Sequence, residues 1–201
     1  METESQKERR LRIEDAAYAV LQDKGYKGTS MLAIAKKAGC SNETLYRWYG
    51  NKQALFASLV VANAEILKPQ IEQLIHADGD TIEELRLLGP RLLDVVTSRK
   101  AVALNRAAAG DVYHTKTLGA AIAEGGKNTI APLVGQLIQN GLDRGFLQGG
   151  TAQQIGQIYI ALLIGDVQIQ RAIGVIHELT PQERNNRADR ACAVIQKLYG
   201  A

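Results

Sequence analysis

The side chains best suited to chemistry gather in one short stretch, GTSMLAIAKKAGCSNETLYRWYGNKQAL, which runs from Gly28 to Leu55. Residues 42–48 carry Asn, Thr, Tyr, Arg and Trp, where a helix buried in a core would carry aliphatic residues. Asn and Thr can read base edges or thymine methyl groups, Arg can fork onto guanine or hold a phosphate, and Tyr can donate to a phosphate oxygen. This pattern predicts recognition of the DNA major groove.

Such side chains need a short helix to present them, and the same stretch predicts two. Thr29 is the expected N-cap of a first helix that continues through Lys37, and Gly39 ends it. Ser41 is the expected N-cap of a second helix that ends at about Tyr49. Two short helices joined by a tight turn form a helix-turn-helix, in which the second helix enters the major groove.

Apolar spacing predicts which residues of these helices are buried. Leu32, Ile34 and Ala35 are the expected buried residues of the first helix, and Leu45 and Tyr49 share one face of the second. A solvated helix face with a half-buried tryptophan is the alternative explanation for the remaining polar residues. The predicted DNA contacts on the second helix are Asn42, Thr44, Tyr46, Arg47 and Trp48.

The rest of the chain is a succession of helical patterns, so we expect an all-α fold with about nine helices. Residues 1–50 are expected to form the DNA-binding domain, and residues 51–201 a helical domain for effector binding and dimerisation. Asn51 is the expected N-cap of a helix that links the two domains. The other expected helices cover residues 7–24, 81–98, 100–109, 117–140, 151–176 and 181–199, the last with a capping box at Thr180, Pro181 and Glu183.

Charge is unevenly distributed along the chain. The net charge is +3, and residues 1–52 hold 10 Lys and Arg against 7 Asp and Glu, so the whole excess lies in the segment with the two short helices. This is the sign expected for contact with phosphates. Cys40 and Cys192 fit no metal or disulfide pattern, and the longest apolar run is too short for a membrane span. We expect a soluble, cytoplasmic protein with no membrane partner.

A cluster of basic residues precedes the first helix core. Lys7, Arg9, Arg10 and Arg12 could contact phosphate or reach into a minor groove. They could equally form a solvated first turn with ion pairs to Glu8 and Glu14. The sequence does not decide between these alternatives.

The stretch resembles the DNA-binding domain of the TetR/AcrR family of bacterial one-component repressors. The resemblance implies an all-helical homodimer with one helix-turn-helix per subunit and a ligand-binding body. The residues that carry it are Gly25–Tyr26, Thr29–Ser30, Ile34–Ala35, Ala38–Gly39, Thr44–Leu45–Tyr46, Lys52 and Leu55–Phe56.

The resemblance also assigns roles to individual residues. It places Asn42, Thr44, Tyr46 and Trp48 on the DNA side of the second helix, and Lys52, Thr29 and Ser30 on phosphates. The residues themselves also favour phosphate binding at Lys52, because its charge lies beside free N–H groups at the start of a helix. Glu43 and Trp48 depart from the usual residue types of the family and leave the base preference open.

The C-terminal part resembles the AefR-like C-terminal domain, which implies that the last two helices form a four-helix dimer interface. Apolar stripes on these helices agree with that arrangement, and a palindromic operator requires a dimer. The stripes comprise Ile155, Ile158, Tyr159, Leu162, Leu163, Val167 and Ile173, and then Ala188, Ala191, Cys192, Ile195, Leu198 and Tyr199.

A small-molecule effector is the other expected partner. The candidate ligand-binding residues, each also compatible with a structural role, are Asn105, Arg106, Tyr113, His114 and Tyr159. We expect no cofactor, metal or enzymatic activity, because nucleophile motifs, phosphate loops and Glu-x-x-His pairs are missing. A helical adaptor, or a small-molecule-binding protein without sequence-specific DNA binding, is the alternative function.

Overall fold

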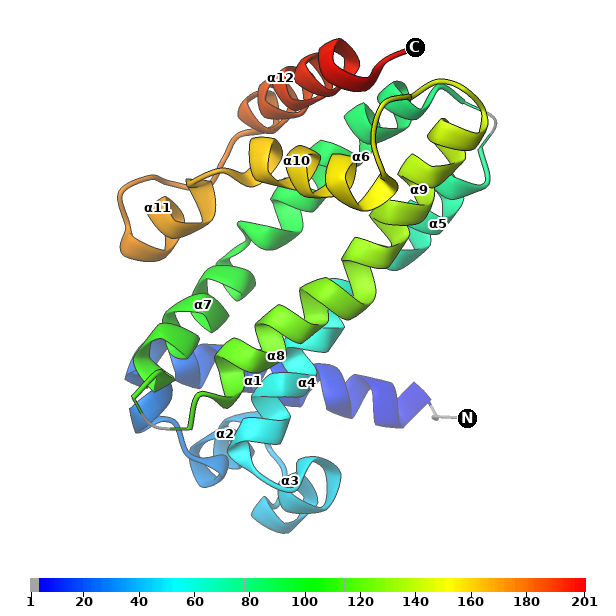
Figure 1. Ribbon diagram of the computed structural model, residues 1–201. Helices are drawn as coiled ribbons and strands as arrows, with labels where there is room; N and C mark the ends of the chain where they lie inside the picture. The colour runs from blue at the N-terminus through cyan, green and yellow to red at the C-terminus, as the bar shows by residue number, and fades with distance from the viewer. Residues whose placement is uncertain (1–3, 78, 114) are drawn as a thin grey trace. The chain divides into compact units, whose positions relative to one another are not determined.

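The computed structural model describes residues 4–77, 79–113 and 115–201, and the described residues are helical without a strand (Figure 1). The predicted all-α fold class is therefore confirmed. The helices are α1 (Glu4–Gly28), α2 (Met31–Ala38), α3 (Asn42–Tyr49), α4 (Lys52–Glu65), α5 (Lys68–Ile75), α6 (Thr81–Val96), α7 (Arg99–Asp111), α8 (Thr117–Gly125), the π-helical turn η1 (Gly126–Ile130), α9 (Ala131–Asp143), α10 (Ala152–Ile164), α11 (Val167–Ile173) and α12 (Pro181–Tyr199).

The helices form two compact units. The first unit comprises the chain up to Ala62 together with Ala103–Ala123, and the second comprises Asn63–Val102 together with Glu124–Ala201. Helix α4 belongs mostly to the first unit, and α7 is divided between the two. The expected division into a DNA-binding domain over residues 1–50 and an effector-binding and dimerisation domain over residues 51–201 stays a prediction.

The first unit has an aliphatic core built by α1 to α4. Ile13 and Ala17 of α1, Leu45 of α3 and Phe56 of α4 are almost completely buried in it. Residues far along the chain complete this core, namely Ala103, Leu104, Ala107 and Leu118 from α7 and α8. The helix-turn-helix therefore rests on a core to which two distant segments contribute.

Local capping explains where the short helices begin, with one correction. Ser30, and not Thr29, is the N-cap of α2, because its side chain accepts a hydrogen bond from the Ala33 N–H at 3.2 Å. The predicted caps at Ser41 and Asn51 are confirmed by their bonds to the backbone of α3 and α4. Leu32 was expected to be buried, but it is 52% exposed.

The second unit is a bundle in which α12 packs on α6 and α10 packs on α9 and α12 (Figure 1). Tyr159 is fully buried at its centre and donates to the Leu85 carbonyl oxygen at 2.6 Å. Gly89 permits the close approach of α6 and α12, since a Cβ atom there would lie 2.7 Å from the Ala188 Cβ.

The helix expected over residues 151–176 is divided into α10 and α11. Gly165 ends α10 with a φ of 50°, a conformation that L side chains rarely adopt. The Arg187 guanidinium donates to the carbonyl oxygens of Leu163 and Ile164 at 3.1 Å and so satisfies the end of α10. The helix expected over residues 117–140 is also interrupted, at η1. The predicted capping box at Thr180 and Glu183 is confirmed.

One segment, Lys52–Ile75, is long and apolar enough to cross a membrane by length and composition alone. It comprises α4 and α5, which are separate helices in the structure. Leu55, Phe56 and Leu59 of α4 and Ile71 of α5 are buried in the two cores, as in the core helices of soluble proteins.

Candidate nucleic-acid interface

Helix α3 presents a polar face because a single residue anchors it. Leu45 is completely buried, whereas Glu43, Tyr46 and Arg47 are exposed, Tyr46 by 49%. The last three lie together on the side of the helix opposite Leu45. An eight-residue helix with one buried anchor and this exposed face has the dimensions and chemistry of a major-groove reader.

Asn42 and Thr44, the predicted base contacts at the start of α3, are half-buried. The Thr44 hydroxyl lies 2.9 Å from the Ser41 hydroxyl, so these two groups share a hydrogen bond. The Asn42 Oδ1 atom is buried and finds no hydrogen-bond partner among the described residues. Both base contacts stay predictions, and the Asn42 oxygen is one of several buried polar atoms without a hydrogen-bond partner among the described residues.

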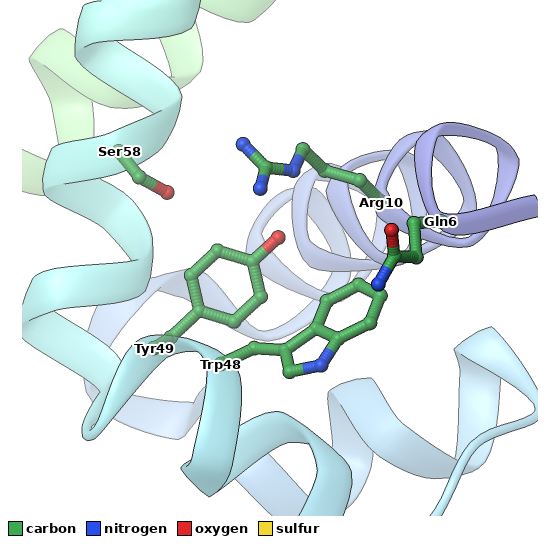
Figure 2. A pocket seen from close by; sticks show the side chains of 5 residues that line it. All are labelled: Gln6, Arg10, Trp48, Tyr49 and Ser58. Carbon is green, nitrogen blue, oxygen red and sulfur yellow. The ribbon is translucent and has the colours of Figure 1, made fainter. Parts of the chain in front are cut away.

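Trp48 lies at the edge of α3 and not at its most exposed face. Its ring packs partly against the core of the first unit and borders a hollow of about 520 Å³. Figure 2 shows Gln6 and Arg10 of α1, Tyr49 of α3 and Ser58 of α4 around the same hollow. The predicted DNA contact of Trp48 would therefore occur beside α1.

Lys52 at the start of α4 is held by backbone atoms. Its ammonium group donates to the carbonyl oxygens of Tyr26 at 2.9 Å and Thr29 at 3.0 Å, and lies 4.3 Å from the centre of the Tyr26 ring. Burial lowers the pKa of Lys52, and the Asp111 carboxylate opposes that shift. Two of the three N–H donors are therefore used inside the protein, and the third is the one that could reach a phosphate.

Of the two residues predicted to contact phosphate at the start of α2, one is buried and the other is exposed. The Thr29 hydroxyl is buried and donates to the Gly25 carbonyl oxygen at 2.7 Å. Ser30 is exposed, and its hydroxyl caps the helix. Ser30 is therefore the better placed of the two residues for a contact outside the protein.

The junction between α7 and α8 contacts the region around Tyr26 and Lys52, and this contact was not predicted from the sequence. Tyr26 packs edge-to-face on Phe56 at 5.4 Å, and its buried hydroxyl, near the Thr117 side chain, has no hydrogen-bond partner among the described residues. Burial, and then the Asp111 charge, raise the pKa of Tyr26. Asp111 is itself buried and accepts hydrogen bonds from the backbone and hydroxyl of Thr115. No local spacing could have indicated the proximity of Tyr26 to Asp111 and Thr117, because these residues are distant in sequence, whereas Asp111 and Thr115 are four residues apart.

The predicted ligand-binding residues do not form one cluster within either unit. Asn105, Arg106 and Tyr113 belong to the first unit and Tyr159 to the second, while His114 lies outside the described residues. Tyr113 is 92% exposed, and the Tyr159 hydroxyl is used by the Leu85 carbonyl. The ligand-binding set stays a prediction. Among the described residues, no group of His, Cys, Asp and Glu is arranged to hold a metal ion.

Comparison with known proteins agrees with this geometry. The pattern of the bacterial regulatory proteins of the tetR family matches residues 13–59, which contain the helix-turn-helix. The pattern of the AefR-like transcriptional repressor C-terminal domain matches residues 83–201, more than half of the chain. The chain belongs to the TetR family. It is a DNA-binding transcriptional regulator, in a family whose members are generally not enzymes.

Relatives extend the match over most of this TetR-family chain. The transcriptional repressor KstR of Mycolicibacterium smegmatis is 26% identical over 181 residues, which cover 85% of this chain and 78% of KstR. A TetR-family regulator structure from Mesorhizobium loti is 26% identical, covers 100% of both chains and has a TM-score of 0.83. FadR of Bacillus subtilis in complex with stearoyl-CoA is 16% identical over 92% of this chain and 96% of its own, and its TM-score of 0.73 concerns the fold alone.

Proposed function

We propose that the protein is a transcriptional repressor that binds a palindromic operator as a homodimer and is released by a small-molecule effector. The observation that carries the proposal is the polar exposed face of α3 at Glu43, Tyr46 and Arg47, anchored by the buried Leu45. A core helix would not leave these side chains in solvent, and an adaptor would have no use for a basic helix-turn-helix. Each subunit places one α3 in one half-site of the major groove.

The dimer forms through α10 and α12. Most of the apolar stripe expected there is buried inside the second unit, including Ile155 and Ile195, so those residues are not available to a partner. Leu162 and Leu198 of the stripe remain exposed, Leu198 by 57%, and so does Val194 of α12, which was not part of the expected stripe. Exposed leucines and valines on two adjacent helices are suited to pairing with the same helices of a second copy.

The effector is expected to be a small and largely apolar molecule. A fold neighbour that holds stearoyl-CoA, and the largely aliphatic core of the second unit, support this class of ligand. The ligand acts by binding one arrangement of the dimer more tightly than the other. Movement of α4 would reach the DNA-binding helices directly, because Lys52 fastens its first residue to the carbonyls that precede α2.

Selection of bound duplexes from a random pool, followed by affinity measurements over a salt series, tests the proposal. Recovery of an inverted repeat with a steep salt slope is the expected result, since phosphate contacts release counterions. Weak binding that is independent of sequence, both with the purified protein alone and with cell-extract metabolites added, would contradict the proposal and favour the adaptor alternative.

A further inference from the structure

Two arginines of α1 lie on the same face of that helix as its buried residues, one turn before the part that packs in the core of the first unit. Ile13 and Ala16 are buried, and Arg9 and Arg12 lie one turn before them on the same side of the helix. The helical pattern would place aliphatic residues at these positions if the core continued. Both arginines are exposed instead, and among the described residues neither forms an ion pair or hydrogen bond.

These arginines border a hollow at the turn of the helix-turn-helix. The hollow has a volume of about 260 Å³ and is lined by Arg9 and Arg12, by Ala38–Ser41 of the turn, and by Thr44 of α3. Burial raises the pKa of the Cys40 thiol, and the charges of both guanidinium groups oppose that shift. Two cations and the hydrogen-bonded hydroxyl pair of Ser41 and Thr44, of which one O–H remains available to donate, thus line one small concavity at the edge of α3.

The hollow has the chemistry of a phosphodiester site. A guanidinium presents a planar fork of N–H donors that matches phosphate oxygens, and hydroxyl groups of Ser and Thr commonly add further hydrogen bonds. The beginning of α3 contributes the positive end of a helix dipole on the same side. A single anionic oxygen group placed there would meet favourable charge from two elements, α1 and α3.

We propose that Arg9 and Arg12, together with Ser41 and Thr44, bind a phosphate of the DNA backbone beside the major groove in which α3 lies. This inference rests on the proposed function. Of the two alternatives that the sequence left open, it selects for Arg9 and Arg12 the phosphate contact, as a phosphate clamp, over the solvated first turn. It also makes Thr44 a contact to the backbone, which fixes the register of α3 without reading a base.

Binding of the selected operator and of a shuffled duplex by full-length protein, over a salt series, tests the clamp. The Arg9→Ala/Arg12→Ala double variant should bind both duplexes on the order of ten-fold more weakly, and its salt slope should fall by about 1 per subunit. Arg9→Lys/Arg12→Lys should keep the slope and recover part of the affinity. The control, Arg91→Ala/Lys197→Ala, removes the same charge from exposed residues of the second unit and should leave the slope unchanged.

A neutral methylphosphonate linkage, placed at each position of the operator backbone in turn, identifies the phosphate. At one position per half-site, this linkage should weaken operator binding by the wild-type protein and leave operator binding by the double variant unchanged. Operator binding by the wild type with an unaltered slope in the double variant would overturn the clamp alone. Failure of the wild type to bind either duplex would overturn the proposed function and the clamp together. Equal melting temperatures of variant and wild type would exclude unfolding as the cause.

Discussion

The ammonium nitrogen of Lys52 lies 3.0 Å from the carbonyl oxygen of Thr29, so the first residue of α4 is bound to the residue that precedes the cap of α2. A second bond to the Tyr26 carbonyl closes the same junction. One side chain therefore sets the relative position of the two helix starts that carry the exposed Ser30 and the half-buried Lys52, both candidates for phosphate contact.

Replacement of this lysine should affect both stability and DNA binding. Lys52→Met removes two charge-assisted hydrogen bonds and should lower the free energy of unfolding by about 1–3 kcal/mol. It should also weaken binding to all duplexes and reduce the salt slope, because both the helix starts and one cation are disturbed. Urea denaturation and filter binding measure the two effects. Lys27→Met, which changes an exposed lysine near the same junction, should do neither.

The residues of α3 should separate into two classes. Tyr46→Ala should weaken binding to operator and shuffled duplex alike, because a phenol can donate to a phosphate oxygen without reading sequence. Asn42→Ala should instead change the preferred sequence, since an amide can pair with adenine in the major groove. Repeated selection with each variant distinguishes the classes. Unchanged sequence preference in Asn42→Ala would remove that residue from the base contacts.

Two glycines within helices should respond in opposite ways to alanine. In Gly89→Ala the new methyl group meets the Ala188 Cβ at 2.7 Å and the Tyr159 hydroxyl at 2.9 Å, so overpacking should cost about 1–3 kcal/mol. In Gly135→Ala nothing lies within 4 Å, and the higher helix propensity of alanine should stabilise α9 by up to about 1 kcal/mol. Thermal denaturation of the pair provides the test, and equal melting temperatures would contradict it.

The two thiols should react at different rates. Cys192 is fully buried, and burial raises its pKa to about 11, so it should resist a disulfide reagent at pH 8. Cys40 is only half-buried and should react first, although burial also raises its pKa. Ellman titration should show one thiol per chain in the native protein and two in urea. Two equally fast thiols in the native protein would contradict the packing of α12.

The start of α12 should contribute stability that depends on pH. Hydrogen bonds from the backbone and hydroxyl of Thr180 hold the pKa of Glu183 below its ordinary value of 4.5. The capping contribution is therefore complete above pH 4.5 and is lost as the pH falls through the lower folded-state pKa. Glu183→Gln should flatten this part of the stability profile, which urea denaturation at several pH values would detect. An identical profile in the variant would exclude the cap as its origin.

Local features of the fold were predictable, and features that depend on distant partners were not. The caps at Ser41, Asn51 and Thr180 follow from residue type alone. Leu32 was misplaced because nearly every residue of α2 is apolar, so periodicity does not distinguish its faces. The helix expected over residues 151–176 was too long because Gly165, with its positive φ, ends α10.

The candidate site shows the same division. The exposure of Tyr46 and Arg47 follows from the helical spacing around Leu45. The contacts of Tyr26 with Thr117, and the charge of Asp111 near Lys52, join segments whose distance along the chain hides their proximity. The same holds for Arg9 and Arg12, whose basic character was evident but whose position over Cys40 depends on how α1 crosses the turn.

The core of the first unit includes Leu104, Ala107 and Leu118, which follow the helix-turn-helix by more than forty residues. The DNA-binding part of this protein is consequently not an independent structural unit that could be transferred alone. A chimaera that transplants residues 1–62 onto another regulator would leave Phe56 and Leu59 without their native neighbours. We expect exchange of specificity between such regulators to require the transfer of α7 and α8 together with the helix-turn-helix.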